Sequence, residues 1–202
     1  MCNRLVIIGA GGHGKVIADI ALKRGYTDIV FADDNAVGFC MEFPIICKST
    51  DVEKLNDGQT DFVIGIGNNE IRKRIAEQHK INWCTLVHPS AQIGMNVKIG
   101  SGTVVMAGAV INSCATVGEH CVINTSAVVE HDSIVGDFVH ISPRATLCGV
   151  VTVGENTHIG AGATVVNTLN VCADCVIGAG AVVVDNIDAQ GTYVGVPARK
   201  AK

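Results

Sequence analysis

The sequence contains few aromatic residues and few charges. Aromatic residues make up only 4% of the 202 residues, so the core has to be built from valine, isoleucine, alanine and other small side chains. Charged residues make up 17% and hydrophobic residues 48%, a balance that excludes an intrinsically disordered chain. The net charge of −4 provides no basic footprint for a nucleic acid.

Membrane and export signals are also missing from the pattern. Residues 99–118 carry no charge, but they include serine, threonine and asparagine and follow a six-residue period, so we expect no transmembrane helix. The apolar stretch Leu5–Ala10 is short and runs directly into glycines, which argues against a signal peptide. We interpret the nine cysteines as reduced thiols of a cytoplasmic protein.

An aliphatic residue recurs at every sixth position from Val87 to Val183. The fifth position of each unit is small or apolar, as at Ala91 and Ala109, and glycine recurs at the second position, as at Gly94. A helix would show a period near 3.6 and an ordinary strand a period of 2. The pattern therefore predicts short flat strands joined by corners, with three units to a coil and residues 18 apart stacked on one another. Glycine suits corners that need a positive φ or a close approach of two backbones.

This period resembles that of the hexapeptide-repeat left-handed parallel β-helix. The handedness comes from the resemblance alone, because the general preference of crossover connections is right-handed. Most proteins with this repeat are acyltransferases that act as trimers. A structural solenoid without chemistry is the alternative interpretation.

The first 82 residues lack the six-residue period and alternate strand and helix patterns instead. We expect strands over 4–8, 29–32 and 62–66 and helices over 15–24 and 70–79, which indicates a small parallel sheet. The predicted fold is a small α/β Rossmann-like N-terminal domain followed by an all-β left-handed parallel β-helix. The predicted boundaries are 1–82 for the Rossmann-like domain, 83–188 for the β-helix, and 189–202 for a C-terminal tail.

A glycine-rich loop follows the first expected strand. Gly9, Gly11 and Gly14 match the GxGxxG spacing and open a helix, where backbone N–H groups and the helix dipole can hold a diphosphate. Asp33 lies where an acidic residue commonly holds a ribose hydroxyl. Alone this motif suggests NAD, but half of a dinucleotide fold suits one nucleotide, such as the uridine diphosphate of an activated sugar. A tight structural turn is the alternative.

The carboxyl ends of the three expected strands carry Gly11–His13, Asp33–Asp34 and Gly67–Asn69. Open α/β sheets bind their ligands at that edge. We therefore expect these three segments to converge on one ligand.

In the repeats, His131 and Asp132 form an adjacent histidine–carboxylate pair. His131 occupies the third position of its unit, near a corner, and a carboxylate neighbour can orient an imidazole and make it a better base. Gly149 lies one coil above, where its N–H could stabilise an oxyanion. His140 is half a coil from His131, so the two could share a site only across a subunit boundary. We interpret His120 and His158 as solvated surface histidines.

Six segments together resemble the nucleotide-sugar acetyltransferases, which include bacterial UDP-4-amino-sugar N-acetyltransferases of bacillosamine synthesis and related sialic-acid O-acetyltransferases. The segments are GAGGHG, Asp33–Asp34, GIGNNEIRKR, NTSAVVEHD, GDFVHISPRATLCG and YVGVPAR. The resemblance covers nearly the whole chain. It implies acetyl-CoA as the co-substrate, no metal, and a homotrimer with active sites between subunits.

The resemblance also implies roles for individual residues. His131 would be the general base, with Asp132 raising its basicity. His140 and the Gly149 amide would meet the thioester carbonyl, and Ala161 and Ala179 would lie along the pantetheine arm. The nucleotide sugar would be held by Gly11, Gly12, His13, Asp33, Asp34, Gly67, Asn68 and Asn69, with Asn124 near the acceptor sugar.

The predicted function is therefore an acetyl-CoA-dependent N-acetyltransferase acting directly on the 4-amino group of a UDP-linked amino-dideoxy sugar. Alternatives are a sugar or sialic-acid O-acetyltransferase, a metal hydratase of the γ-carbonic-anhydrase type, and a non-catalytic nucleotide-sugar binder. A ping-pong route through cysteine is a further alternative, but the repeat cysteines occupy slots where small residues pack. Cys172 and Cys175 form a single CxxC without a partner pair, so we expect no zinc site. Arg199 and Lys200 are candidates to contact the 3′-phosphate of coenzyme A.

Overall fold

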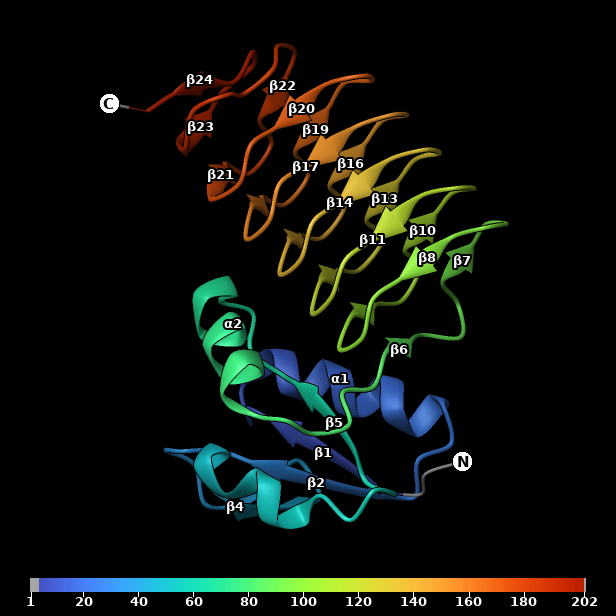
Figure 1. The fold of residues 1–202 in the computed structure, drawn as a ribbon, viewed down its shortest axis with the longest axis vertical. Helices are drawn as coiled ribbons and strands as arrows, with labels where there is room; N and C mark the ends of the chain where they lie inside the picture. The colour runs from blue at the N-terminus through green and yellow to red at the C-terminus, as the bar shows by residue number, and fades with distance from the viewer. Residues whose placement is uncertain (1–3, 202) are drawn as a thin grey trace.

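The computed structural model describes residues 4–201. It consists of a small α/β layer and a column of stacked coils, with the C-terminal end of the chain at the far end of the column (Figure 1). The α/β layer contains β1 (Arg4–Ile8), α1 (Gly12–Lys23), β2 (Asp28–Ala32), β3 (Gly38–Cys40), β4 (Phe43–Cys47), a 3₁₀ helix (Ser49–Leu55), β5 (Asp61–Ile64) and α2 (Asn69–Gln78).

The sheet of this layer has the strand order β3-β4-β2-β1-β5 and is parallel except for the β3–β4 pair. Side chains of β1 alternate between its two faces. Leu5 and Ile7 pack in the cluster that contains the buried side of α1, whereas Val6 and Ile8 pack with Ile75 of α2 on the other face. Strands buried on both faces are expected to be continuously hydrophobic, which explains why β1 is predicted correctly from sequence.

The other four predicted elements of this layer shift by one to three residues, and its strands β3 and β4 were not predicted. β5 ends at Ile64, two residues earlier than expected, because Gly65 begins a close backbone crossing in which a Cβ would lie 2.8 Å from the Gly14 Cα. The helix α1 begins at Gly12 rather than residue 15. The hairpin of β3 and β4 extends the sheet beyond β2 and has no clear alternation of buried and exposed residues.

The column is a parallel β-helix of three sheets, as predicted. The first sheet contains β7 (Gln92–Ile93), β10 (Val110–Ile111), β13 (Val128–Val129), β16 (Thr146–Leu147), β19 (Thr164–Val165) and β22 (Val182–Val183). The second contains β8 (Lys98–Ile99), β11 (Thr116–Val117), β14 (Ile134–Val135), β17 (Thr152–Val153) and β20 (Asn170–Val171). The third contains β6 (Leu86–Val87), β9 (Val104–Val105), β12 (Val122–Ile123), β15 (His140–Ile141), β18 (His158–Ile159), β21 (Cys175–Ile177), β23 (Gly191–Val194) and β24 (Arg199–Lys200).

The register of the coils follows the six-residue period. Val110 pairs with Val128, and His140 pairs with His158, so paired residues are 18 apart. First-position side chains such as Ile111 and fifth-position side chains such as Ala115 are fully buried in the coil interior. Each buried aliphatic side chain contributes roughly 1.5–3 kcal/mol before entropy is subtracted, which is how a chain with few aromatics sustains this core.

The corner residue in the left-handed conformation is the fourth residue of each unit, not the second. It is often not glycine: Asp132, Phe138 and Asn156 have φ values of 58°, 59° and 60°. The second-position glycines serve close approach instead, since a Cβ on Gly94 would lie 2.6 Å from the Ser113 nitrogen of the next coil. Glycine at the second position therefore allows close approach of two backbones and does not supply a positive φ.

The α/β layer docks on the third sheet of the β-helix. Leu86, Val104 and Val122, which lie on that sheet, belong to the same buried cluster as α1. On the other side, α2 lies against the coils (Figure 1). This docking brings the carboxyl edge of the small sheet close to the histidines of β15 and β18. Among the described residues, no helix is long and apolar enough to cross a membrane.

Candidate active site

The glycines of the glycine-rich loop are of two kinds: some are required by the shape of the turn, and others have open space where a side chain would be. Gly9 has a φ of +109° and a Cβ on Gly14 would collide with the Gly9 carbonyl, so both are required by the turn itself. A Cβ on Gly11 or Gly12 would meet nothing within 4 Å. These two glycines stand at the N-terminus of α1, where N–H groups face outward and favour an anion.

Asp33 and Asp34 form part of the wall of a cavity of about 440 Å³ at the carboxyl edge of the sheet. Asp33 accepts hydrogen bonds from the N–H groups of Ala10, Asn35 and Ala36. Burial acts to raise the pKa of Asp33, but these backbone donors hold it below its ordinary value. Asp33 thus ties the glycine loop to the loop after β2. Asp34 accepts from the backbone and hydroxyl of Ser49.

The third predicted segment, Gly67–Asn69, lines a second cavity of about 600 Å³ together with His140, His158 and residues of neighbouring corners. The Asn68 side chain caps α2 by accepting from the Ile71 N–H at 2.9 Å. The Asn69 amide is 8% exposed and donates to the Asn156 and Thr157 carbonyls. The resemblance implies that both residues hold the nucleotide sugar; both line this cavity, and each side chain also has a partner within the chain.

His140 is held by both ring nitrogens. Its Nδ1 lies 3.1 Å from the Gly67 carbonyl oxygen and its Nε2 lies 3.0 Å from the Asn124 amide nitrogen. A carbonyl only accepts, so Nδ1 carries the proton and Nε2 accepts from Asn124. Burial, followed by the charges of His158, Arg72 and His13, lowers the pKa of His140 to about 3 against the opposing effect of the Gly67 bond. His140 is therefore a neutral imidazole with a fixed tautomer.

Two further histidines adjoin His140. The ring of His13 lies 6.3 Å and that of His158 lies 4.8 Å from it, and His158 Nε2 lies 2.9 Å from the Ser142 hydroxyl. His120 was expected on the solvated surface but is 3% exposed. It stacks on Phe138 with centroids 5.4 Å apart and meets Trp83 edge-on, because docking of the α/β layer covers it.

These buried histidines predict a loss of stability in mild acid. Burial and Arg72 lower the pKa of His13 and of His120 to about 4, from an ordinary 6.5. Below pH 6.5 these histidines bind protons in the unfolded chain but stay neutral in the folded chain. Each histidine therefore lowers the free energy of unfolding by up to about 1.4 kcal/mol for each pH unit. Urea unfolding at about pH 7.5 and about pH 5.5 measures this loss. His120→Phe should make the dependence shallower, and equal stability at both pH values would contradict the prediction.

His131 lies on a different edge of the β-helix, at the corner that follows β13. Its Nδ1 is 2.8 Å from Asp132 Oδ2 and the two side chains are 58% and 57% exposed. The carboxylate accepts, so Nδ1 carries the proton and Nε2 keeps a free lone pair. That Nε2 sits beneath Gly149, where a Cβ would come within 2.7 Å of it. The stacking predicted for His131 and Gly149 is present in the structure.

The remaining predicted residues are distributed over other edges. Ala161 and Ala179 are exposed and lie one coil apart at the corners after β18 and β21. Arg199 contacts Asp185 at 3.4 Å and Lys200 donates to the Gln190 carbonyl. One chain alone does not bring His131, His140 and the two alanines together, because they lie at different positions around the coil.

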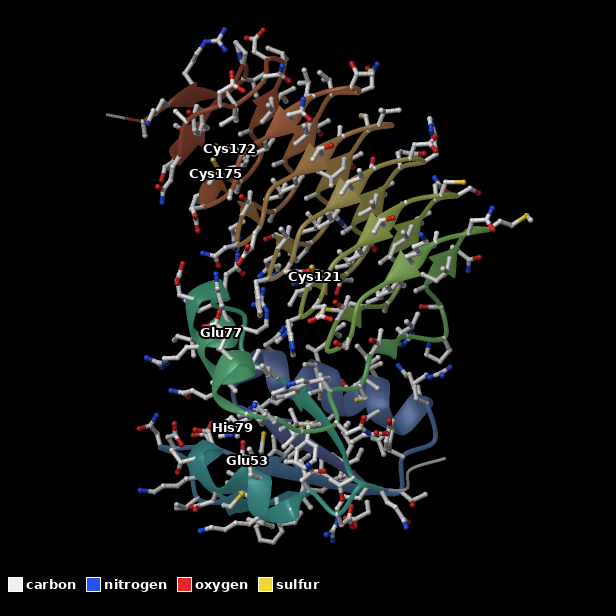
Figure 2. All side chains as sticks on the ribbon, viewed as in Figure 1. Glu53, Glu77, His79, Cys121, Cys172 and Cys175 are labelled. Atoms are coloured by element: carbon white, nitrogen blue, oxygen red, sulfur yellow. The ribbon has the colours of Figure 1, made fainter. Side chains whose placement is uncertain are left out.

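Two of the described repeat cysteines are buried thiols. Cys121 and Cys175 are fully buried inside the coils (Figure 2), and burial raises the pKa of each thiol to about 12. Cys172 Sγ lies 3.3 Å from Cys175 Sγ. Within residues 4–201, no group of three or more histidine, cysteine, aspartate or glutamate side chains is placed to hold a metal ion.

One residue of the site escaped sequence reasoning. Arg72 appears in a strongly charged segment that was interpreted as a surface helix, yet it is 1% exposed and contacts the Gly67 loop and the coils. Only the spacing to Asn69 and Ile75, which share its helix face, could have suggested that it points inward.

Comparison with known proteins adds to this geometry. Residues 4–79 match the family model described as the PglD N-terminal domain, and residues 132–167 match the bacterial transferase hexapeptide (six repeats). The chain is 38% identical to the acetyltransferase domain of PglB from Neisseria gonorrhoeae solved in complex with acetyl coenzyme A, with a TM-score of 0.97 and 100% of both chains covered.

Two further relatives extend the likeness. PerB from Caulobacter crescentus, solved in complex with CoA and GDP-perosamine, is 34% identical with a TM-score of 0.90, over 100% of this chain and 99% of that one. The UDP-N-acetylbacillosamine N-acetyltransferase of Bacillus subtilis (strain 168) is 41% identical over 109 residues, or 50% of this chain. That match spans only 50% of the length of the Bacillus protein.

Proposed function

The chain belongs to the family of hexapeptide-repeat sugar N-acetyltransferases with a PglD-type N-terminal domain, and from that premise we propose that it transfers the acetyl group of acetyl-CoA to the amino group of a nucleotide-linked amino sugar. The finer proposal is a UDP-linked 4-amino-dideoxy sugar as the acceptor. The observation that carries the chemistry is His131, oriented by Asp132 and with Nε2 beneath Gly149.

The proposed reaction is a direct transfer. The acceptor amine attacks the thioester carbonyl, a C–N bond forms, and Nε2 of His131 takes a proton from the nitrogen. The C–S bond then breaks, and coenzyme A leaves with the proton as a thiol. Gly149 lies close to the same nitrogen of His131, and its N–H would stabilise the developing oxyanion. Asp132 keeps the imidazole in the tautomer that can accept at Nε2.

The nucleotide would occupy the cavity bounded by Asp33 and Asp34, with its diphosphate at the open glycines. Its sugar would reach toward the cavity that His140 lines. Because His131 stands on another edge of the same chain, we propose that a neighbouring subunit of a homotrimer supplies it. Ile134 and Val150, which flank the His131 corner, are 52% and 48% exposed and offer an apolar surface for such a contact.

A pair of glycine substitutions separates binding from folding. Gly12→Trp should fold normally, because a side chain there enters open space, but it should raise the KM for the nucleotide sugar at least about tenfold by filling the anion site. Gly14→Ala should instead lower the melting temperature, because its Cβ collides with the Gly9 carbonyl. Steady-state kinetics and thermal unfolding of both variants check this, and unchanged kinetics of folded Gly12→Trp would place the diphosphate elsewhere.

Release of the coenzyme A thiol tests the whole proposal. We expect release when acetyl-CoA is supplied with a UDP-linked 4-amino sugar, and none with the matching 4-hydroxyl sugar. The same assay with amino sugars linked to GDP and dTDP measures how strongly the protein selects the nucleobase of its substrate. Preference for the hydroxyl sugar would make the protein an O-acetyltransferase, and nucleotide-sugar binding without any release would make it a binding protein.

A further inference from the structure

We propose that Arg72 is a positioning residue that fixes the Gly67 loop, and through it His140, against the β-helix; this inference rests on the function proposed above. Arg72 comes from α2 and is 1% exposed. Arginine has five N–H donors, and the guanidinium uses all of them on oxygens of the chain. The acceptors are the carbonyls of Ile66, Gly67, His120 and Phe138 and the side-chain oxygen of Asn69.

The five acceptors belong to two different parts of the molecule. Nη1 bonds the Ile66 and Gly67 carbonyls at 3.1 and 3.2 Å, within the loop after β5. Nε bonds the His120 carbonyl and Nη2 bonds the Phe138 carbonyl, both at 2.7 Å. His120 and Phe138 are left-handed corner residues of successive coils. A single planar group therefore sets the distance between the loop and two coils of the β-helix.

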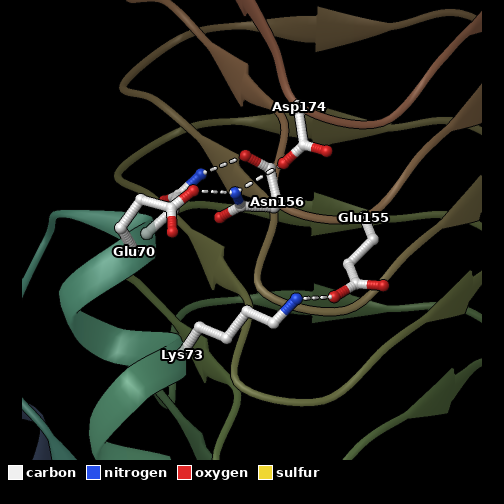
Figure 3. Close-up of polar contacts among 6 residues, drawn as sticks. Glu70, Lys73, Glu155, Asn156 and Asp174 are labelled. Atoms are coloured by element: carbon white, nitrogen blue, oxygen red, sulfur yellow. Dashed lines mark hydrogen bonds and ion pairs between the residues drawn. The ribbon is translucent and has the colours of Figure 1, made fainter.

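The corner geometry explains why a donor is needed there. Buried carbonyls at the docking surface must be paired, and successive corners present theirs in a column toward α2. Arg72 pairs with two of these corners, and the Asn69 amide continues the column by donating to the Asn156 carbonyl at 3.0 Å. The neighbouring side chain contacts are seen in Figure 3, where Glu70 and Asp174 both meet the Asn156 amide.

The link to His140 runs through one carbonyl. The Gly67 oxygen accepts from Arg72 Nη1 and also from His140 Nδ1. Without Arg72 this carbonyl oxygen would be free to move, and the hydrogen bond that it accepts from His140 Nδ1 would be lost. The loop at the same point lines the cavity proposed for the sugar, so substrate position and imidazole orientation depend on one guanidinium.

The charge of Arg72 is matched by oxygens and not by a counter-ion. No carboxylate within residues 4–201 forms an ion pair with it, and burial lowers its pKa only to about 10, so it stays charged near neutrality. The titratable groups that its charge affects are His13, His120, Cys121, His140 and His158. On the four rings burial is the larger cause, and the charge of Arg72 lowers their pKa values further.

Lys73 provides a matched control on the same helix. Its Nζ pairs with Glu155 Oε1 at 2.6 Å across the same docking surface (Figure 3), with side chains 33% and 46% exposed. A residue that merely docks the α/β layer would behave like Lys73. A positioning residue would alter His140 and the substrate site specifically.

The experiment compares Arg72→Lys, Arg72→Met and Lys73→Met in the full chain. Lysine keeps the charge but cannot reach all five acceptors, so for Arg72→Lys we expect kcat/KM for the nucleotide sugar to fall by about 10- to 100-fold while the KM for acetyl-CoA stays within about twofold. Lys73→Met should stay within about twofold of wild type in both. Arg72→Met should lose more, and if it does not fold, the lysine variant decides the question.

A second readout does not depend on turnover. In protein with ¹⁵N-labelled histidine, the wild type should show His140 as a neutral ring protonated at Nδ1, and Arg72→Lys should lose that single signature while Lys73→Met keeps it. The proposal is overturned if Arg72→Lys retains both the signature and the kinetics, or if Lys73→Met is impaired equally. A wild type that transfers no acetyl group would sink the proposed function, whereas the NMR comparison would still judge the role of Arg72.

Discussion

Alanine at His131 is expected to lower kcat by about 10²- to 10⁴-fold, the range typical for loss of a general base. Asp132 holds Nδ1 of the ring and Nε2 lies beside Gly149, so the substitution removes the proposed proton acceptor. The KM for acetyl-CoA should hardly change, because the ring accepts a proton and does not anchor the donor. Thiol release under saturating substrates measures both constants.

A second histidine–carboxylate pair supplies the control for this variant. His79 at the end of α2 lies 3.4 Å from Glu53 of the 3₁₀ helix, far from the coils (Figure 2). His79→Ala should retain nearly the full rate. Asp132→Asn should lose less than His131→Ala, since an amide can still orient the ring. Retention of as much as about a tenth of the wild-type rate by His131→Ala would remove it as the base.

The repeat region illustrates how much of a fold the sequence can predict. Each unit of six buries its first and fifth residues, as Ile111 and Ala115 show, and the same requirement recurs in every coil. A slip of one residue would expose a whole column of aliphatic side chains. Strand positions, register and the stacking of Gly149 over His131 therefore follow from spacing alone.

The hairpin of β3 and β4 could not be predicted in this way. Its residues are mostly exposed or half-buried, so no face imposes a period on the sequence. Its position depends on pairing with β2, which is a long-range contact. The polar corner residues posed the same difficulty, because Asp132 and Asn156 adopt left-handed φ values that a search for glycines does not reveal.

The contacts of the candidate site were harder to predict from the sequence than the fold of the repeats. Asp33 and Asp34 line one cavity at the sheet edge and Gly67–Asn69 line another, whereas Gly11–His13 line neither of the two. However, the partners of Asn68, Asn69 and Arg72 lie on α2 or on coils far along the chain. Whether an amide binds substrate or a corner carbonyl depends on docking of the two parts, which local spacing does not encode.

Two impaired variants should restore activity to each other, at nucleotide-sugar concentrations below the KM of Gly12→Trp, if the active site lies between subunits. In each chain His131 stands on a separate edge from the Gly67 loop and His140, so a complete site would take its base from one subunit and its nucleotide pocket from the next. Gly12→Trp damages only the pocket, and His131→Ala damages only the base.

Co-expression of these two variants in equal amounts, with different affinity tags and selection for both, should yield about a third of the wild-type number of intact sites, because every mixed cyclic trimer has one interface that pairs an intact base with an intact pocket. Each variant purified alone should remain at its low rate, and the mixture should have the mass of three chains. A site contained within one chain would never be complete in either variant, so mixing would restore nothing. If mixing restores nothing, or if the protein is a monomer, His131 cannot reach a sugar bound in the cavity that His140 lines. The proposed direct transfer to that sugar would then be wrong.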